Sequence, residues 1–181
     1  MFWVTRDYVH VDRVACPWLI SRFIDKRAQF IFMPRDKITD FVEKTGAIPY
    51  DTGLGTELNH YELDGEKYCT FDAVMRKYEL GDDEALALLQ KIVRAADTNR
   101  FDEEPLAWGF EAIASGTPLI VETDHEALEM EFPFYEALYA YLQREIVLEK
   151  SKDEIAKLKT RGEKREFLRN AIAKLDSKKL K

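Results

Sequence analysis

The sequence predicts an α/β (α+β) protein with a small N-terminal sheet, flanking helices and a mostly helical C-terminal half. Short apolar runs at 2–5 and 28–33 have the length and composition of buried strands. After Thr70, apolar residues recur at helical spacing almost to the end of the chain. With 181 residues, of which 46% are hydrophobic, the chain is long enough to bury a sizeable core.

Proline and glycine mark the boundaries of the N-terminal elements. Pro34 closes the second strand, and Gly46 is a suitable C-terminal cap for a short helix. The dipeptide Asp64-Gly65 favours a tight turn. The expected elements are strands at 2–5, 28–33 and 48–50, a helix at 36–44, and a hairpin or two irregular strands at 57–63 and 68–71.

The first helix carries both reactive and apolar residues. Pro17 fits the first helical position, because it lacks a backbone donor and its φ is already helical, so Cys16 is the expected N-cap. An alternative start has Asp12 as the cap and Pro17 as a kink in the second turn. In the first case the helix dipole lowers the pKa of the Cys16 thiol and makes it a candidate thiolate. The alternative role for Cys16 is that of a small buried hydrophobe.

The C-terminal half is predicted to be a series of capped helices. The last of them carries an apolar stripe that favours packing in the core, and Pro133 is expected to divide it. The expected helices run from Thr70 or Asp72 to Tyr78, from a cap at Asp82 to about Ala96, from Glu104-Pro105 to Ser115, and onward from a cap at Asp124. The stripe consists of Phe134, Leu138, Tyr141, Leu142 and Ile146.

Charge divides the chain into a domain over 1–150 and an extension over 151–181. The extension holds eleven Lys/Arg and five Asp/Glu, a net charge of +6, whereas 1–150 holds 16 basic and 29 acidic residues, a net of −13. The acidic domain argues against direct DNA binding. The basic extension, with a weak helical stripe broken at Gly162, is expected to pack on an acidic face of the same chain or of a homodimer partner.

The lack of a recognisable targeting segment and the low number of cysteines predict a cytoplasmic protein. Residues 2–4 are apolar, but Arg6 and Asp7 follow directly, so we expect no secretory segment, and no run is long enough to span a membrane. Two cysteines, Cys16 and Cys69, are too few for a disulfide framework and have no metal-finger spacing.

Ligand-type side chains gather at the predicted ends of elements. Asp97 ends a helix, where the dipole disfavours a carboxylate unless a cation or an arginine compensates it. We therefore expect His60, Glu57 and Asp97 to converge near the loop that carries His10, Asp12 and Arg13, and to hold a divalent metal such as Zn, Mn or Fe. Asp12 and Asp72 are the next candidates, as ligands or as partners that orient His60. A salt bridge from Asp97 to Arg94, Arg100 or Arg13 is the alternative. His125 is excluded, because it lies in the first turn of a surface helix.

Several motifs resemble the ChrB-type chromate resistance domain in order and spacing. They are Trp3-Val-Thr-Arg6, the block from His10 to Asp25, Pro49-Tyr-Asp51, Glu57-x-x-His60, Cys69-Thr-Phe-Asp72 and Ala96-Asp-Thr98, and the resemblance covers roughly 2–145. It implies a role in chromate resistance or sensing. Longer members carry an N-terminal region linked to transcriptional control, and this sequence begins directly at the domain, so a DNA-binding role is not expected.

Two classes of function follow. The first is a sensor domain that binds a metal through His60 and nearby carboxylates, or an oxyanion through Arg6, Arg13, Arg22 and the amides of the first helix. The second is an enzyme that acts on a small oxyanion or redox substrate. It would use a metal as Lewis acid or Cys16 as a thiolate, with Cys16, Asp12 and Arg13 as catalytic candidates.

Overall fold

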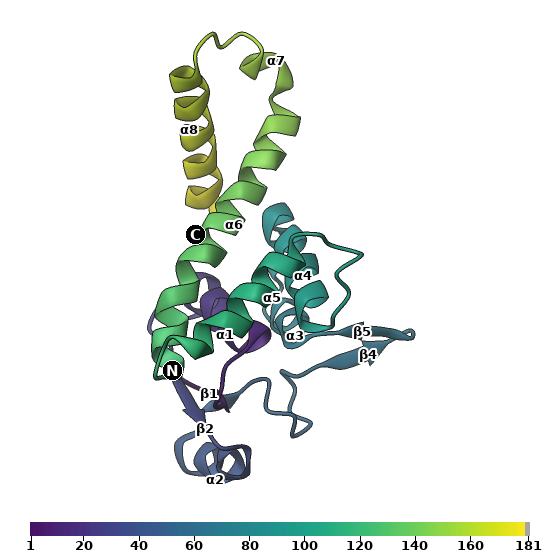
Figure 1. The fold of residues 1–181 in the computed structure, drawn as a ribbon, viewed down its shortest axis with the longest axis vertical. Helices are drawn as coiled ribbons and strands as arrows, with labels where there is room; N and C mark the ends of the chain where they lie inside the picture. The colour runs from purple at the N-terminus through teal and green to yellow at the C-terminus, as the bar shows by residue number, and fades with distance from the viewer. Residues whose placement is uncertain (180–181) are drawn as a thin grey trace.

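The computed structural model describes the backbone of residues 1–179 and the side chains of 1–175. A small three-stranded sheet lies at one end of the molecule, and a helical hairpin projects from the other end (Figure 1). The strands are β1 (Phe2–Arg6), β2 (Gln29–Met33), β3 (Ile48–Pro49), β4 (Tyr61–Leu63) and β5 (Glu66–Tyr68). The longer helices are α1 (Val11–Leu19), α2 (Arg35–Thr45), α3 (Thr70–Lys77), α4 (Glu84–Asp97), α5 (Ala107–Gly116), α6 (Asp124–Lys150) and α8 (Arg161–Lys179). The α+β fold predicted from the sequence is confirmed.

The sheet has the order β2-β1-β3, and both pairings are parallel. The central strand is covered on both faces, because Trp3 belongs to the main core with α1, whereas Val4 packs in a second cluster with Ile38 of α2. Alternate residues of a strand point to opposite faces, so α1 and α2 cover opposite sides of the sheet. This arrangement brings the carboxyl ends of β1 and β3 together, next to the start of α1.

The second sheet is the antiparallel hairpin of β4 and β5, which the Asp64-Gly65 turn predicted. Both turn residues have positive φ angles, 53° and 79°, as a tight two-residue hairpin turn requires. Tyr61 and Tyr68 stack across the two strands with ring centroids 4.8 Å apart. The hairpin fixes the position of the segment that leads into it, which contains His60.

The start of α1 differs from the expected one. The N-cap is His10, and Pro17 lies inside the helix, so the prediction of Cys16 as N-cap is wrong. The alternative start at Asp12 was closer, since Asp12 lies in the first turn. Core packing explains the result, because Val11, Val14 and Trp18 are almost completely buried at helical spacing along one face. The chain then continues into a π-helical turn, Ile20–Ile24.

Helix α6 also differs from the prediction, because Pro133 does not divide it. The helix packs on α1 and α4, it has buried residues on both sides of the proline, and Tyr135 and Tyr139 contact Trp18. Within the predicted core stripe, Leu138 and Leu142 are buried, but Phe134 and Tyr141 are 46% and 45% exposed. Three other boundaries moved slightly: the caps are Asp83 and Thr123 rather than Asp82 and Asp124, and α5 begins at Ala107 rather than beside Pro105.

The extension after Lys150 forms the short helix α7 (Lys152–Ile155) and then α8, which packs beside the C-terminal half of α6 in the same chain (Figure 1). The helical break precedes α8, which begins at Arg161, so Gly162 lies in its first turn. Among the described residues, no helix is long and apolar enough to cross a membrane.

Candidate metal centre

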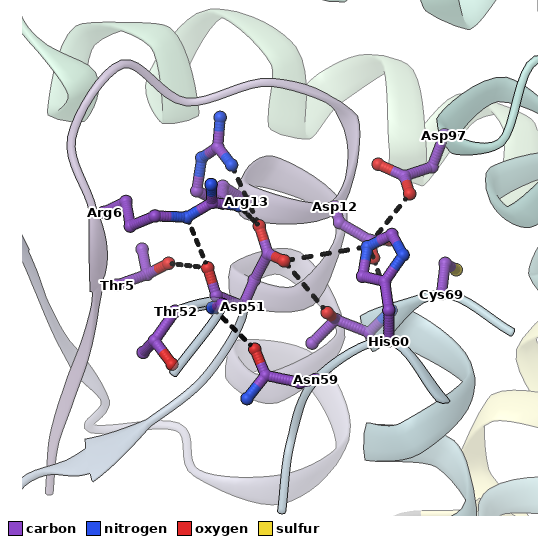
Figure 2. A network of polar contacts seen from close by, with 12 residues as sticks. Thr5, Arg6, Asp12, Arg13, Asp51, Thr52, Asn59, His60, Cys69 and Asp97 are labelled. Atoms are coloured by element: carbon purple, nitrogen blue, oxygen red, sulfur yellow. Dashed lines mark hydrogen bonds and ion pairs between the residues drawn. The ribbon is translucent and has the colours of Figure 1, made fainter. Parts of the chain in front are cut away.

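Three side chains from distant parts of the chain converge at one point: Asp12, His60 and Asp97 (Figure 2). Asp12 lies in the first turn of α1, Asp97 is the last residue of α4, and His60 directly precedes β4. The His60 Nε2 atom lies 3.4 Å from Asp12 Oδ2 and 3.2 Å from Asp97 Oδ2. One ligand atom from each residue lies within 4.8 Å of the other two, a spacing that suits a single metal ion.

Asp12 is fully buried, Asp97 is mostly buried, and the imidazole of His60 lies at the surface. The side chain of Asp12 is 1% exposed and that of Asp97 is 13% exposed, whereas that of His60 is 49% exposed. Asp12 Oδ1 is buried without a hydrogen-bond partner, and Asp97 Oδ2 has only the ion-pair contact with His60. A buried carboxylate oxygen without a donor has lost its hydration and gained nothing in exchange. Asp12 Oδ1 and Asp97 Oδ2 are therefore available to accept a hydrogen bond or to bind a cation.

The electrostatics of the site show a surplus of negative charge. Burial and, to a smaller extent, the nearby Asp12 charge raise the pKa of Asp97 to about 8, against the opposing effect of His60. Burial also raises the pKa of Asp12, although its hydrogen bond with His60 opposes the rise. The hydrogen bond to Asp12 raises the pKa of His60 to about 9, despite partial burial. Without another cation, the group therefore retains protons at neutral pH.

The helix dipoles act differently on the two carboxylates. Asp12 lies at the start of α1, where the dipole favours negative charge, and it accepts a hydrogen bond from the backbone amide of Thr70 at 2.5 Å. Asp97 lies at the end of α4, where the dipole disfavours it. Among the described residues, its ion pair is with His60, and no arginine bridge of the kind proposed as an alternative joins it. The unfavourable position of Asp97 thus remains uncompensated by any arginine ion pair.

Asp51, which the sequence analysis named in a motif but not as a site candidate, connects the elements around this centre. Its carboxylate accepts hydrogen bonds from Arg6 at 3.1 Å and Arg13 at 3.0 Å (Figure 2), and from Thr70 at 3.1 Å. Its carbonyl accepts from Arg6 Nε at 2.9 Å and from Thr5 at 3.4 Å. Asp51 lies two residues after the end of β3 and has a positive φ of 44°, a backbone geometry that is costly for a residue other than glycine. The signal in the sequence was its place at the end of the Pro49-Tyr-Asp51 motif.

The arginines considered as oxyanion ligands already have carboxylate partners. Arg6 and Arg13 both bind Asp51, and Arg22 binds Glu136 at 2.8 Å. Their charges are therefore partly neutralised inside the protein. The amides expected to assist them at a helix beginning at Pro17 are instead inside α1, where they belong to the helical ladder.

Three further candidates lie outside the centre. Glu57 pairs with Lys77 and is 69% exposed, so its expected convergence with His60 is wrong. Asp72 is fully buried but bound by Arg94 and by the Gln90 amide. Cys16 is buried, and burial together with the charge of Asp12 raises the pKa of its thiol well above the usual value, opposite to the expected shift. A thiolate role for Cys16 loses its physical basis.

The two other histidines have separate surroundings. His10 Nε2 lies 3.2 Å from Glu111 and 3.5 Å from Ser115, both on α5. His125 Nε2 lies 3.0 Å from the carbonyl of Phe30 and packs edge-on against Phe32. His60 is thus the imidazole placed against two buried carboxylates.

Comparison with known proteins identifies the family. The sequence pattern of the family described as ChrB, C-terminal domain, matches residues 3–142. Protein ChrB of Cupriavidus metallidurans (strain ATCC 43123 / DSM 2839 / NBRC 102507 / CH34) is 29% identical over 145 residues, which cover 77% of this chain and 40% of that protein. The chain thus spans about two fifths of the length of this relative. No solved structure matches the chain. The chain belongs to the family of ChrB C-terminal domains.

Proposed function

We propose that this domain binds a divalent metal ion through Asp12, His60 and Asp97 and serves as a metal-responsive sensor module in chromate resistance. The observation that carries the proposal is the buried, unpartnered oxygen of Asp12 beside a second buried carboxylate and one imidazole. One neutral imidazole and two carboxylates are a ligand set used for zinc, manganese and iron. Three protein ligands leave coordination positions for water or for a small ligand.

A divalent cation removes each electrostatic conflict at the centre. It supplies the positive charge that the carboxylates lack, and it offsets the unfavourable dipole at the end of α4, where Asp97 lies. It also replaces the proton on His60 Nε2, the atom that faces both carboxylates. Asp51 supports the arrangement from one side, because its Oδ1 atom lies 3.7 Å from the same imidazole nitrogen.

Metal binding at this point connects three segments of the fold. Asp12 belongs to α1, Asp97 to α4, and His60 to the loop that enters the β4–β5 hairpin. The two acidic ligands are on helices of the core, whereas His60 is on a half-exposed segment at the surface. Occupancy of the site therefore fixes a surface loop to a rigid core, which is the kind of local change that a sensor needs.

The test is a comparison of His60→Ala with His125→Ala, measured by elemental analysis of purified protein and by calorimetric titration with zinc, manganese and iron(II). We expect His60→Ala to lose at least about tenfold in metal affinity, since ligand loss and even loss of orienting partners have effects of this size. His125→Ala is the matched control, because this imidazole contacts a backbone carbonyl instead. Equal metal content and equal melting temperatures in the two variants would disprove the site.

A further inference from the structure

Helix α6 has an exposed face with the character of a helix-packing surface. Met130, Phe134 and Tyr141 are 38%, 46% and 45% exposed there, and Ala137 and Ala140 are also exposed. The positions 130, 134, 137 and 141 alternate steps of four and three residues, which is the spacing of a seam between two packed helices. We call these five residues the α6 seam. Ala137, Ala140 and Tyr141 lie next to α8, yet all five side chains are exposed among the described residues.

The seam continues into a groove between α6 and α8. The groove has a volume of about 550 Å³, and its apolar floor includes Tyr141, Leu168 and Ile172. Its lining also includes five basic side chains: Arg144, Arg161, Lys164, Arg165 and Arg169. Arg144 is close to Glu145, but no carboxylate partner is described for the four cations of α8. The C-terminal end of the seam is therefore apolar in its centre and strongly positive at its rim.

The opposite end of the same face is acidic. Glu126 and Glu129 lie exposed on α6 one turn before the seam and at its start. Glu122, which precedes the helix, donates its backbone amide to Glu126 at 2.8 Å and adds a further negative charge. The charge along the α6 face thus changes from negative to positive, with the small residue Ala137 near the middle.

We propose that this face binds a second copy of the chain, with the two α6 helices antiparallel about a two-fold axis near Ala137. In that register, Ala137 of one copy meets Ala137 of the partner subunit, and the small side chains there allow the helices to approach closely. The acidic start of each α6 then lies against the basic groove of the other copy. Every favourable contact occurs twice, as a two-fold interface requires.

The charge distribution favours a second copy over other occupants. A duplex nucleic acid would meet Glu126 and Glu129 along with the basic groove, and it would leave the apolar seam uncovered. A parallel pair of copies would place like charges together at both ends, which is costly. An antiparallel pair buries Phe134 and Tyr141 and also matches opposite charges. This inference does not depend on the metal centre.

The first test measures the mass of the full chain by sedimentation equilibrium across the micromolar range, at low and at high salt. We expect a dimer that dissociates more readily at high salt, because the matched charges are at the exposed rim. Phe134→Glu should weaken the dimer at least about tenfold, as loss of a central aromatic contact does. Leu119→Glu is the matched control, since Leu119 is 82% exposed and lies off the seam.

The second test determines the register in which the two α6 helices pack. Ala137→Cys should form a disulfide-linked dimer under a mild copper oxidant, because this residue faces its own equivalent, whereas Leu119→Cys should not. Glu129→Arg and Arg144→Glu should each weaken the dimer, and the double variant should restore it, since the pair is only exchanged. A monomer at all concentrations, a dimer unaffected by Phe134→Glu, or a monomer that binds duplex DNA or anionic vesicles through this face would overturn the proposal.

Discussion

The buried carboxylates of this domain fall into two groups that differ in what faces them. Asp51 and Asp72 each face arginine: Asp51 binds Arg6 and Arg13, and Asp72 binds Arg94. Asp12 and Asp97 instead face each other and one half-exposed imidazole (Figure 2). The first group is neutralised by arginine, whereas the second keeps a surplus of negative charge.

This difference is the reason for proposing that the first group is structural and that the second binds a ligand. A buried carboxylate with a bidentate arginine has its acceptor sites filled and its charge balanced. A buried carboxylate with an unpaired oxygen costs stability unless something else compensates it. Since the same fold pairs Asp51 and Asp72 fully, the lack of pairing at Asp12 and Asp97 points to a function.

The largest expected effect comes from breaking the buried ion pair between Arg94 and Asp72. Arg94→Ala removes the guanidinium that binds Asp72, whose side chain is 0% exposed. Removing one partner of a buried pair costs about 3–5 kcal/mol, because the other charge stays buried. Urea denaturation of the metal-free protein measures this loss. A loss below about 1 kcal/mol, the value typical of surface pairs, would show that Asp72 does not depend on Arg94 for neutralisation.

Removing a charge from the group of Asp12 and Asp97 should have the opposite effect and stabilise the metal-free fold. The pKa of Asp97 in the folded chain, about 8, is above its ordinary value of 3.8, so its ionisation destabilises the metal-free fold as pH rises through that interval. Asp97→Asn should therefore stabilise the metal-free protein above about pH 8, by on the order of 1–2 kcal/mol. The same variant should lose metal affinity. Thermal unfolding with a chelator, followed by metal titration, tests both statements, and a destabilised metal-free variant would contradict the charge surplus.

Metal binding by Asp12, His60 and Asp97 should also depend on pH. Metal must displace protons from His60 and Asp97, whose pKa values are about 9 and about 8. Affinity should rise by about tenfold per pH unit for each proton released and should level off above about pH 9. Calorimetry in two buffers of different ionisation enthalpy counts the protons. An affinity that does not change with pH would mean that the ion binds elsewhere.

The sequence predicted the parts of the fold and of the site that depend on local pattern. The runs that became β1 and β2 are apolar and bounded by turn residues, and the structure contains both strands. His60, Asp97 and Asp12 were expected to meet because each lies at the end of an element, and the structure places them together. Whether they hold a metal stays a prediction.

Other features depend on long-range packing, which local pattern does not contain. The role of Asp51 requires β3 to pair beside β1 and requires a positive φ at a residue that is not glycine. Pro17 is normally a helix-start signal, but the burial of Val11 and Val14 extends α1 toward the N-terminus despite it. The extent to which α8 leaves α6 exposed depends likewise on how the two helices pack.

The smallest expected effect concerns Glu57, which we expected to converge with His60 because both lie at the ends of elements. In the structure, Leu58 between them forms an isolated β-bridge with Tyr50. Leu58 is consequently buried, and its neighbour Glu57 lies outside, paired with Lys77. Glu57→Gln should change stability by less than about 0.5 kcal/mol, as exposed pairs usually do, and should leave metal affinity unchanged. If this variant instead lost metal as Asp97→Asn does, the loop before β4 would have to rearrange on binding, and the centre would include a carboxylate that the metal-free fold keeps at the surface.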